Sequence, residues 1–233
     1  MTKADIEAFK VAFVAASERA VAAGIDAIEI HNAHGYLLHQ FLSPASNQRT
    51  DEYGGSFENR VRLTLEVVEL VRAAIPRDMP LFLRISATDW LTQDTPELES
   101  WNVEDTVRLA PLLAECGVDL LDVSSGGLHP LQHIHAGPGY QVPFALAVKR
   151  AVGETMAVSA VGSITEAKQA EEYLQAGLDM VVIGRTFLKN PGIVWQFADE
   201  LGVQAHWANQ QRWPFAGRAP KPKGMASDAG VKN

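Results

Sequence analysis

The sequence predicts an α/β fold built as a (β/α)8 barrel, of which about five strands are visible in the 233 residues. Helical patterns alternate with short strands rich in Val, Ile and Leu. These strands are apolar on both faces, which is typical of a parallel sheet covered by helices. Polar residues follow several of the strands, where a barrel carries its functional groups.

The helices are predicted from apolar residues at helical spacing and from residues that end a helix. They are expected over residues 5–23, 58–74, 103–115, 144–152 and 165–176, with a last helix after Pro191. Gly24 closes the first helix as a C-cap residue, and Pro76 stops the second. Cys116 and Gly117 end the third.

The strands are expected over residues 25–30, 81–86, 118–124, 156–161 and 180–183. A doubly wound sheet would show a GxGxxG turn after its first strand, and the sequence has none there. A barrel explains the polar strand ends better, although eight strands are needed and about five are seen.

Composition limits the function classes. With 47% hydrophobic and 21% charged residues, the chain is typical of a soluble globular protein. A net charge of -8 disfavours a nucleic-acid or basic membrane surface, and no run is long enough for a membrane helix. The polar start predicts a cytoplasmic location, and the lone Cys116 is interpreted as a packing residue. Residues 1–216 form the expected barrel part, and the Pro/Gly-rich residues 217–233 are predicted to be a disordered tail.

Two histidines and a tyrosine follow the first strand: His31, His34 and Tyr36, with Gly35 permitting a sharp turn between them. Two imidazoles and a phenol are donors that can hold a carbonyl oxygen and deliver a proton beside it. The spacing is also compatible with a structural histidine pair or with half a metal site.

A phosphate site is predicted at the last two strand ends, where Gly162-Ser163 and Gly184-Arg185 lie. Barrel loops after the final strands often bind phosphate, and arginine is a bidentate donor to it. Ser163 or Thr165 is expected to cap the next helix. Turn glycines with a surface arginine are the structural alternative.

For other polar residues the sequence predicts less specific roles. Arg84 lies inside an apolar strand and is expected to pair with Glu29, to face an electron-rich ligand ring, or to do both. The loop 43–60 is predicted to be held by its own polar network. His129, His133 and His135 share a loop without ligand-spaced carboxylates or cysteines, so no metal site is predicted.

Long segments of the chain resemble the old yellow enzyme family, the FMN-dependent ene-reductases. The segment that carries the family's signature is IEIHNAHGYLLHQFLSPASNQRTDEYGGSFENRVR. DLLDVSSGG, PGYQVPFA, SAVGSIT and MVVIGRTFLKNP are similar to its later strands. The HxxH form resembles the branch of xenobiotic reductases and thermostable ene-reductases. A single cysteine excludes the iron–sulfur cluster of the related dienoyl-CoA reductases.

The resemblance implies a role for each candidate residue. His31 and His34 would bind the substrate carbonyl, and Tyr36 would protonate the carbon alpha to it. Arg84 would face the N1/O2 edge of FMN, and Gly162, Gly184 and Arg185 would bind its phosphate. The expected site therefore comprises His31, His34, Tyr36, Arg84, Gly162, Gly184 and Arg185.

The resemblance also implies which part of the barrel is present. Strands four to eight are expected, and the three N-terminal strands that carry further flavin contacts are missing. Arg212 resembles an arginine that some members insert into a neighbouring subunit's active site, which predicts a substrate-binding role in a homo-oligomer; a surface arginine is the alternative.

The leading hypothesis is an FMN-dependent reductase that uses NADPH or NADH to reduce the C=C bond of an α,β-unsaturated carbonyl compound. One alternative is a truncated barrel fragment that is inactive alone and serves in folding or assembly. Another is a flavin-free phosphate-binding barrel enzyme. Flavin colour on purification distinguishes the first from the others.

Overall fold

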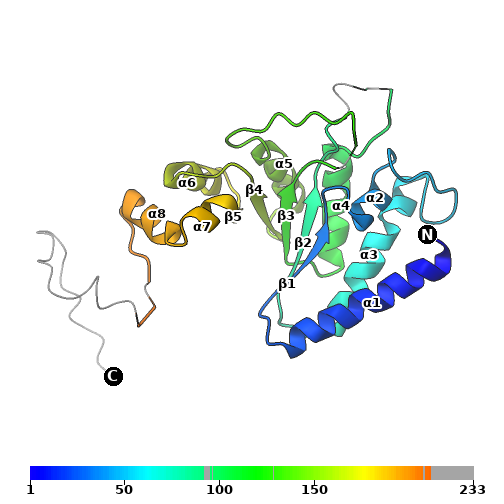
Figure 1. Cartoon of the computed structure of the whole chain (residues 1–233), viewed down its shortest axis with the longest axis horizontal. Coiled ribbons are helices and arrows are strands. Elements are labelled where there is room, and N and C mark those ends of the chain that lie inside the picture. Colours follow the sequence, from blue (N-terminus) through cyan, green and yellow to red (C-terminus); the bar gives the residue numbers. More distant parts are fainter. Residues whose placement is uncertain (92–94, 96, 128, 207, 211–233) are drawn as a thin grey trace, which may run out of the picture.

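A single parallel sheet organises the protein. The computed structural model describes residues 1–91, 95, 97–127, 129–206 and 208–210 (Figure 1). Its strands lie in the order β1-β2-β3-β4-β5, so each strand pairs with the next one along the chain. They are β1 (Ile28–Asn32), β2 (Leu81–Ser86), β3 (Leu120–Ser124), β4 (Ala157–Val161) and β5 (Met180–Val182). All four pairings are parallel, as predicted.

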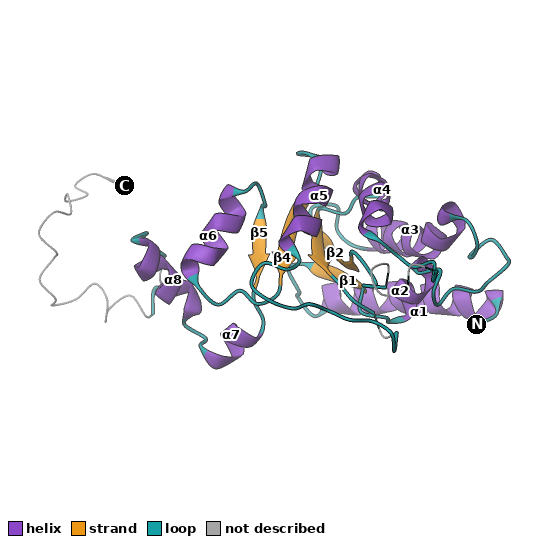
Figure 2. Cartoon of the chain, turned by 90° about the horizontal axis from the view of Figure 1, so that it is seen from above, coloured by secondary structure: helices purple, strands orange, loops and turns teal. Residues whose placement is uncertain are grey.

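Every predicted helix is present. They are α1 (Lys3–Ala22), α3 (Phe57–Ala74), α4 (Val103–Glu115), α5 (Val142–Val152), α6 (Ala167–Gln175) and α8 (Ile193–Leu201). Two short helices were not predicted, α2 (Leu37–Leu42) and α7 (Arg185–Lys189). Figure 2 shows α3, α4, α5 and α6 in a row along one side of the strands, as in a barrel wall.

Side-chain caps fix where the longer helices begin. Thr2 and Asn102 each form a capping box, with Asp5 and Asp105 as the reciprocal partners. The predicted cap of α6 is wrong, because its N-cap residue is Glu166 and no side chain caps it. Gln169 reaches back instead and accepts a hydrogen bond from Thr165 N–H at 3.1 Å.

The two faces of the sheet differ sharply in burial. The face toward the helices is apolar and closed, and its residues Ile30, Leu83, Ile85, Val123 and Val158 are at most 1% exposed. The opposite, inner face carries polar groups and is partly open to solvent. On that face the strand register brings four residues into one row, namely His31, Arg84, Asp122 and Ser159.

The polar loop before α3 is held by its own network, as predicted. Asn47 Nδ2 donates to the carbonyls of Phe41 and Tyr53, both at 2.7 Å. Arg60 donates to the Leu42 carbonyl from Nε at 2.8 Å and to the Gly55 carbonyl from Nη1 at 2.6 Å. These bonds fasten the loop to the end of α2 and therefore stabilise the segment next to His31.

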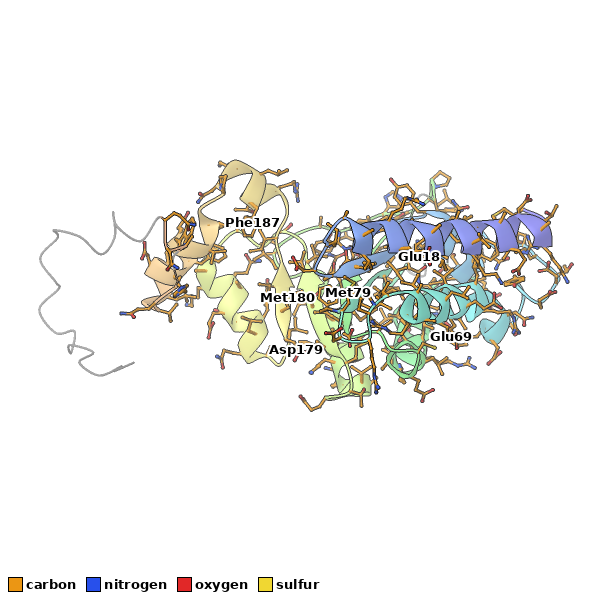
Figure 3. All side chains as sticks on the ribbon, turned by 90° about the horizontal axis from the view of Figure 1, so that it is seen from below. Glu18, Glu69, Met79, Asp179, Met180 and Phe187 are labelled. Atoms are coloured by element: carbon orange, nitrogen blue, oxygen red, sulfur yellow. The ribbon has the colours of Figure 1, made fainter. Side chains whose placement is uncertain are left out.

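Burial is most complete in α3, β2 and β3, and it falls toward β5 and α7. Figure 3 shows Met180 on β5 and Phe187 on α7, on the less crowded side of the molecule. Phe187 is 38% exposed. Along the described part of the chain, no helix combines the length and apolar character that crossing a membrane requires. The predicted boundary at residue 216 and the tail 217–233 lie outside the described residues.

Candidate active site

A tight turn follows β1 and gathers the three predicted catalytic side chains. His34 and Gly35 are both left-handed, with φ angles of 61° and 76°. Left-handed backbone is costly for histidine and easy for glycine. The turn places the His31 ring centroid 5.2 Å from that of His34 and 5.4 Å from that of Tyr36. Tyr36, the N-cap residue of α2, is 60% exposed and its phenol is accessible.

Both histidines are held in the neutral form. Burial of the ring, together with the charges of His31 and Arg84, lowers the pKa of His34 to about 4. Partial burial, followed by the charge of Arg84, also lowers the pKa of His31. His34 Nε2 is hydrogen-bonded to Ser124 Oγ at 2.8 Å. At neutral pH each ring therefore offers one N–H donor and one acceptor.

Arg84 is anchored on the inner face by two carboxylates. Its Nε and Nη2 each lie 2.5 Å from Asp122 Oδ2, and Nε lies 3.7 Å from Glu29 Oε2. The expected pair with Glu29 is thus present, but Asp122 is the closer partner. Asp122 is completely buried and also accepts a hydrogen bond from Ser159 Oγ at 2.8 Å. Within the described residues no partner is seen for Arg84 Nη1.

Asp122 is a functional neighbour that the sequence reasoning missed. A signal for it existed, because it is the only charged residue inside the otherwise apolar β3, just as Arg84 is inside β2. Charges buried inside adjacent strands are usually paired. The register Arg84↔Asp122 could not be read from the sequence, since it depends on how the strands align.

One cavity of about 800 Å³ connects the two predicted halves of the site. Its lining includes His34 and Arg84 at one end, and Gly162, Gly184 and Arg185 at the other. Val161, Val182 and Ile183 contribute apolar wall between them. The cavity thus joins the β1 turn to the loops after β4 and β5. Arg185 is exposed, and no carboxylate in the described part of the chain pairs with it.

Gln141 connects this cavity to His34. Its Oε1 accepts from Ser125 Oγ at 2.5 Å and from Ser124 Oγ at 3.3 Å, and its Nε2 donates to the Val161 carbonyl at 2.5 Å. Ser124 in turn is bonded to His34. Gln141 was not predicted as a site residue, because neither residue spacing nor composition marks a buried glutamine as part of a site.

The remaining sequence-predicted residues lie apart from this cluster. No group of three or more potential metal ligands occurs in the residues that the structure covers. The loop of His129, His133 and His135 runs between β3 and α5, and none of these histidines lines the large cavity. Arg212 lies outside the described residues.

Comparison with known proteins identifies relatives of most of the chain. A profile of the NADH:flavin oxidoreductase / NADH oxidase family matches residues 1–203. An NADH:flavin oxidoreductase of Gibberella zeae is 57% identical over 223 residues, which are 93% of this chain and 54% of that protein. An NADPH dehydrogenase of Geobacillus sp. (strain WCH70) is 47% identical over 218 residues, or 92% of this chain and 61% of that protein. The chain therefore spans little more than half the length of these curated relatives.

Solved structures agree on the fold. A 2-naphthoyl-CoA reductase complexed with 2-naphthoyl-CoA matches with a TM-score of 0.78 and 25% identity, over 86% of this chain and 30% of that one. A mutant of morphinone reductase with bound tetrahydroNAD matches with a TM-score of 0.67 and 27% identity, over 88% of this chain and 51% of that one. The predicted barrel architecture, with about five of its strands present, is confirmed. By the extent of the profile match, the chain belongs to the NADH:flavin oxidoreductase / NADH oxidase family.

Proposed function

We propose that this chain carries the substrate-activating and phosphate-binding part of an FMN-dependent NAD(P)H oxidoreductase that reduces the C=C bond of α,β-unsaturated carbonyl compounds. The observation that carries the proposal is the single cavity joining His34 and Arg84 to Gly162, Gly184 and Arg185. The NADPH dehydrogenase and NADH:flavin oxidoreductase relatives support the same activity.

The donor set of the cavity fits FMN. The end with Gly162, Gly184 and Arg185 offers backbone donors for a phosphate, and a guanidinium that has no ion pair within the described residues. The apolar middle suits a flat ring, and Arg84 supplies positive charge where a ring gains electrons. When bound, FMN supplies the two-electron chemistry that links oxidation of NAD(P)H to reduction of the alkene.

His31 and His34 polarise the substrate. Each neutral ring donates one N–H toward the carbonyl oxygen, which gains negative charge as the β carbon is reduced. Because the rings stay neutral at pH 7, they stabilise this charge by hydrogen bonding without first giving up a proton. His34 Nε2 has two ways to accommodate the carbonyl. It can replace its hydrogen bond to Ser124 Oγ with one to the substrate oxygen, or it can stay bonded to Ser124, in which case His31 alone donates to the substrate oxygen.

Tyr36 supplies the proton. Its exposed phenol stands beside the His31 ring, so its O–H can protonate the carbon alpha to the bound carbonyl. The overall reaction consumes one hydride equivalent from NAD(P)H and one proton, and it yields the saturated carbonyl compound and NAD(P)⁺.

The other parts of the proposal concern the whole protein. We assign it to the cytoplasm and expect a small activated alkene as substrate, NADPH or NADH as hydride donor, and a homo-oligomeric state. Residues 1–216 constitute its barrel part. Arg212 is proposed to bind substrate from a neighbouring subunit, and residues 217–233 are proposed to be a disordered tail.

A second candidate, the fragment that is inactive alone, is favoured by one observation. Glu29 and His31 on the inner face of β1 are exposed, and β1 pairs only with β2 among the described strands. An added wall of strands would cover this face. The candidate predicts that the 233-residue chain binds FMN weakly, and that a family-like N-terminal segment supplied in trans restores yellow colour and turnover.

Tyr36→Phe tests the leading proposal, because phenylalanine keeps the ring and removes only the proton-bearing hydroxyl. Stopped-flow measurement should show slower alkene reduction and nearly unchanged flavin reduction by nicotinamide. Equal losses in both half-reactions would remove Tyr36 from its role. Absence of flavin absorbance, with and without the N-terminal segment, would contradict the FMN proposal itself.

A further inference from the structure

The turn that carries His34 and Tyr36 is held by side chains outside the proposed catalytic set. His34 N–H donates to Ser86 Oγ at 2.9 Å, and Gln40 Nε2 donates to the Gly35 carbonyl at 2.6 Å. Gly35 N–H donates to Nδ1 of His39 at 2.8 Å. The turn has one backbone bond of its own, from Tyr36 N–H to the Ala33 carbonyl at 3.2 Å. Two adjacent left-handed residues are costly, so the three side-chain bonds add to it in holding the conformation of the turn.

The bond to Gly35 determines the tautomer of His39. A ring nitrogen that accepts a hydrogen bond cannot itself carry a proton, so Nδ1 is bare and the single proton is on Nε2. His39 lies on α2, is 1% exposed, and faces Asp89 with this second nitrogen. Nε2 lies 3.0 Å from Asp89 Oδ1, with the ring N–H pointing off the direct line to that oxygen.

Asp89 is built to stay ionised and in place. It is 4% exposed, and its Oδ2 accepts from Ser43 Oγ at 2.5 Å and from Trp101 N–H at 2.9 Å. Burial works against ionisation, but the nearby His39 ring and the bonds from Ser43 and the Trp101 backbone outweigh it and lower the pKa of Asp89. A fixed carboxylate beside Nε2 favours the proton at that nitrogen and leaves Nδ1 free to accept.

The loop after β3 closes over this pair. A Cβ atom built on Gly127 would lie 3.4 Å from both Asp89 Oδ1 and His39 Cε1, so the loop passes beside the pair with room for little more than a methyl group between them. A smaller cavity of about 190 Å³ borders the same residues, separate from the large cavity. The pair is therefore outside the proposed substrate site and acts only through the turn.

We propose that His39, held by Asp89 as the neutral Nε2–H tautomer, is a positioning residue that sets the His34-Gly35-Tyr36 turn. His39 contacts no substrate; it presents one acceptor to Gly35 N–H and thereby fixes where the His34 ring and the Tyr36 phenol stand. The catalytic consequence rests on the proposed function, whereas the structural assignment does not. Neither spacing nor residue type marked His39, which the sequence shows only as a polar residue within the stretch LLHQFL.

Two matched variants distinguish the role of His39 Nδ1 as a hydrogen-bond acceptor from the role of Nε2 as a donor. In His39→Asn the amide oxygen can take the place of Nδ1 and still accept from Gly35. In His39→Gln the amide reaches the place of Nε2, so Asp89 keeps a partner and Gly35 loses its acceptor. Both variants remove the ring and retain a neutral polar group, so a purely steric role would affect them alike.

The structural measurement is NMR on the full chain. Histidine labelled with ¹⁵N should show His39 with Nδ1 unprotonated and Nε2 protonated. Exchange of the Gly35 amide should be unchanged in His39→Asn and about tenfold faster in His39→Gln, the effect of losing one hydrogen bond. The Ala87 amide, which donates to the Ser124 carbonyl at 2.9 Å, serves as the internal reference for global stability. A protonated Nδ1, or equal Gly35 exchange in both variants after this correction, would overturn the assignment.

The functional measurement is enone reduction by the flavin-loaded protein. His39→Gln should lower kcat about tenfold with a smaller change in KM, and His39→Asn should restore most of it. If the Gly35 amide exchanges faster in His39→Gln but turnover is unchanged, the positioning role is overturned. If the unmutated chain reduces no enone yet shows the NMR pattern, the proposed function fails and the assignment of the turn stands.

Discussion

The two ends of the large cavity are built in different ways. At the β1 end, the strands beneath the catalytic turn are closed by fully buried residues such as Leu83, Ile85 and Val123. At the β5 end, all three strand residues are only half-buried, and α7 contains no buried residue. Leu188 on α7 is 86% exposed. Regions with few buried contacts open most easily, so the catalytic end is expected to be preformed and the phosphate end to be ordered by its ligand.

Polar groups are also more firmly paired near the β1 end of the cavity than near the β5 end. Across β2 to β4, Arg84, Asp122 and Ser159 form a linked row on buried or half-buried atoms. Around β5, the bond from Thr186 Oγ1 to the Ile164 carbonyl at 3.1 Å ties α7 to the loop after β4. Arg185 lies next to it without an ion pair in the described chain. An arginine held this loosely is available to an incoming phosphate.

The largest expected effect comes from breaking the row at its buried centre. Asp122→Ala should lower the free energy of unfolding by about 3–5 kcal/mol, because it leaves Arg84 without its closest counter-charge. Urea unfolding followed by circular dichroism measures this. Glu58→Ala, which breaks the exposed pair with Arg108, is the control and should cost less than about 1 kcal/mol. Similar losses in both variants would mean that the inner row is not a preformed element.

A smaller effect is expected at the phosphate end. Arg185→Ala should leave the unfolding free energy almost unchanged and weaken FMN binding about 10- to 100-fold, through loss of charge-assisted hydrogen bonds. Flavin fluorescence quenching gives the dissociation constant. Arg150→Ala, an exposed arginine on α5 that does not line the cavity, is the matched control. An unchanged dissociation constant in Arg185→Ala would place the phosphate elsewhere.

The smallest expected effect is on the loss of folding stability at acidic pH. Because the folded-state pKa of His34 lies below the usual 6.5, the unfolded chain binds more protons between pH 6.5 and about 4, and stability falls as the pH is lowered through this range. His34 should contribute about 1 kcal/mol to this fall, a value discounted because the ring is only half buried. Urea midpoints of His34→Gln should therefore depend less on pH than those of the unmutated chain.

An exposed histidine provides the comparison for that experiment. His133→Gln, which makes the same substitution in the loop between β3 and α5, is the matched control. If His34→Gln retains the full slope, His34 is not held neutral by its surroundings, and the electrostatic account of the β1 end fails.

Much of this fold could be predicted from the sequence, and the exceptions have physical causes. The bounds of β2 and α4 were predicted as they stand, because an apolar run marks β2 locally, and helical periodicity ending at Gly117 marks α4. β3 was expected from Val118 but begins at Leu120. Val118 N–H bonds back to the Leu113 carbonyl, so that residue still belongs to the end of α4.

The residues of the candidate site likewise divide into those that local sequence marks and those that only the fold brings together. His31, His34 and Tyr36 lie within six residues of one another, so a sequence motif could reveal them. The carboxylates that the structure adds nearby, Asp122 at Arg84 and Asp89 at His39, come from other strands and loops. Their contacts depend on strand register and on closure of the turn, which no local pattern encodes.

Backbone hydrogen exchange with and without FMN tests the contrast between the two ends most directly. On addition of saturating FMN, amides of residues 180–189 should become protected, whereas those of residues 31–39 should change little because their turn is already held. Protection of both ends to the same degree, or an unaltered exchange rate over residues 180–189 with FMN bound, would contradict a preformed catalytic end and a ligand-ordered phosphate end.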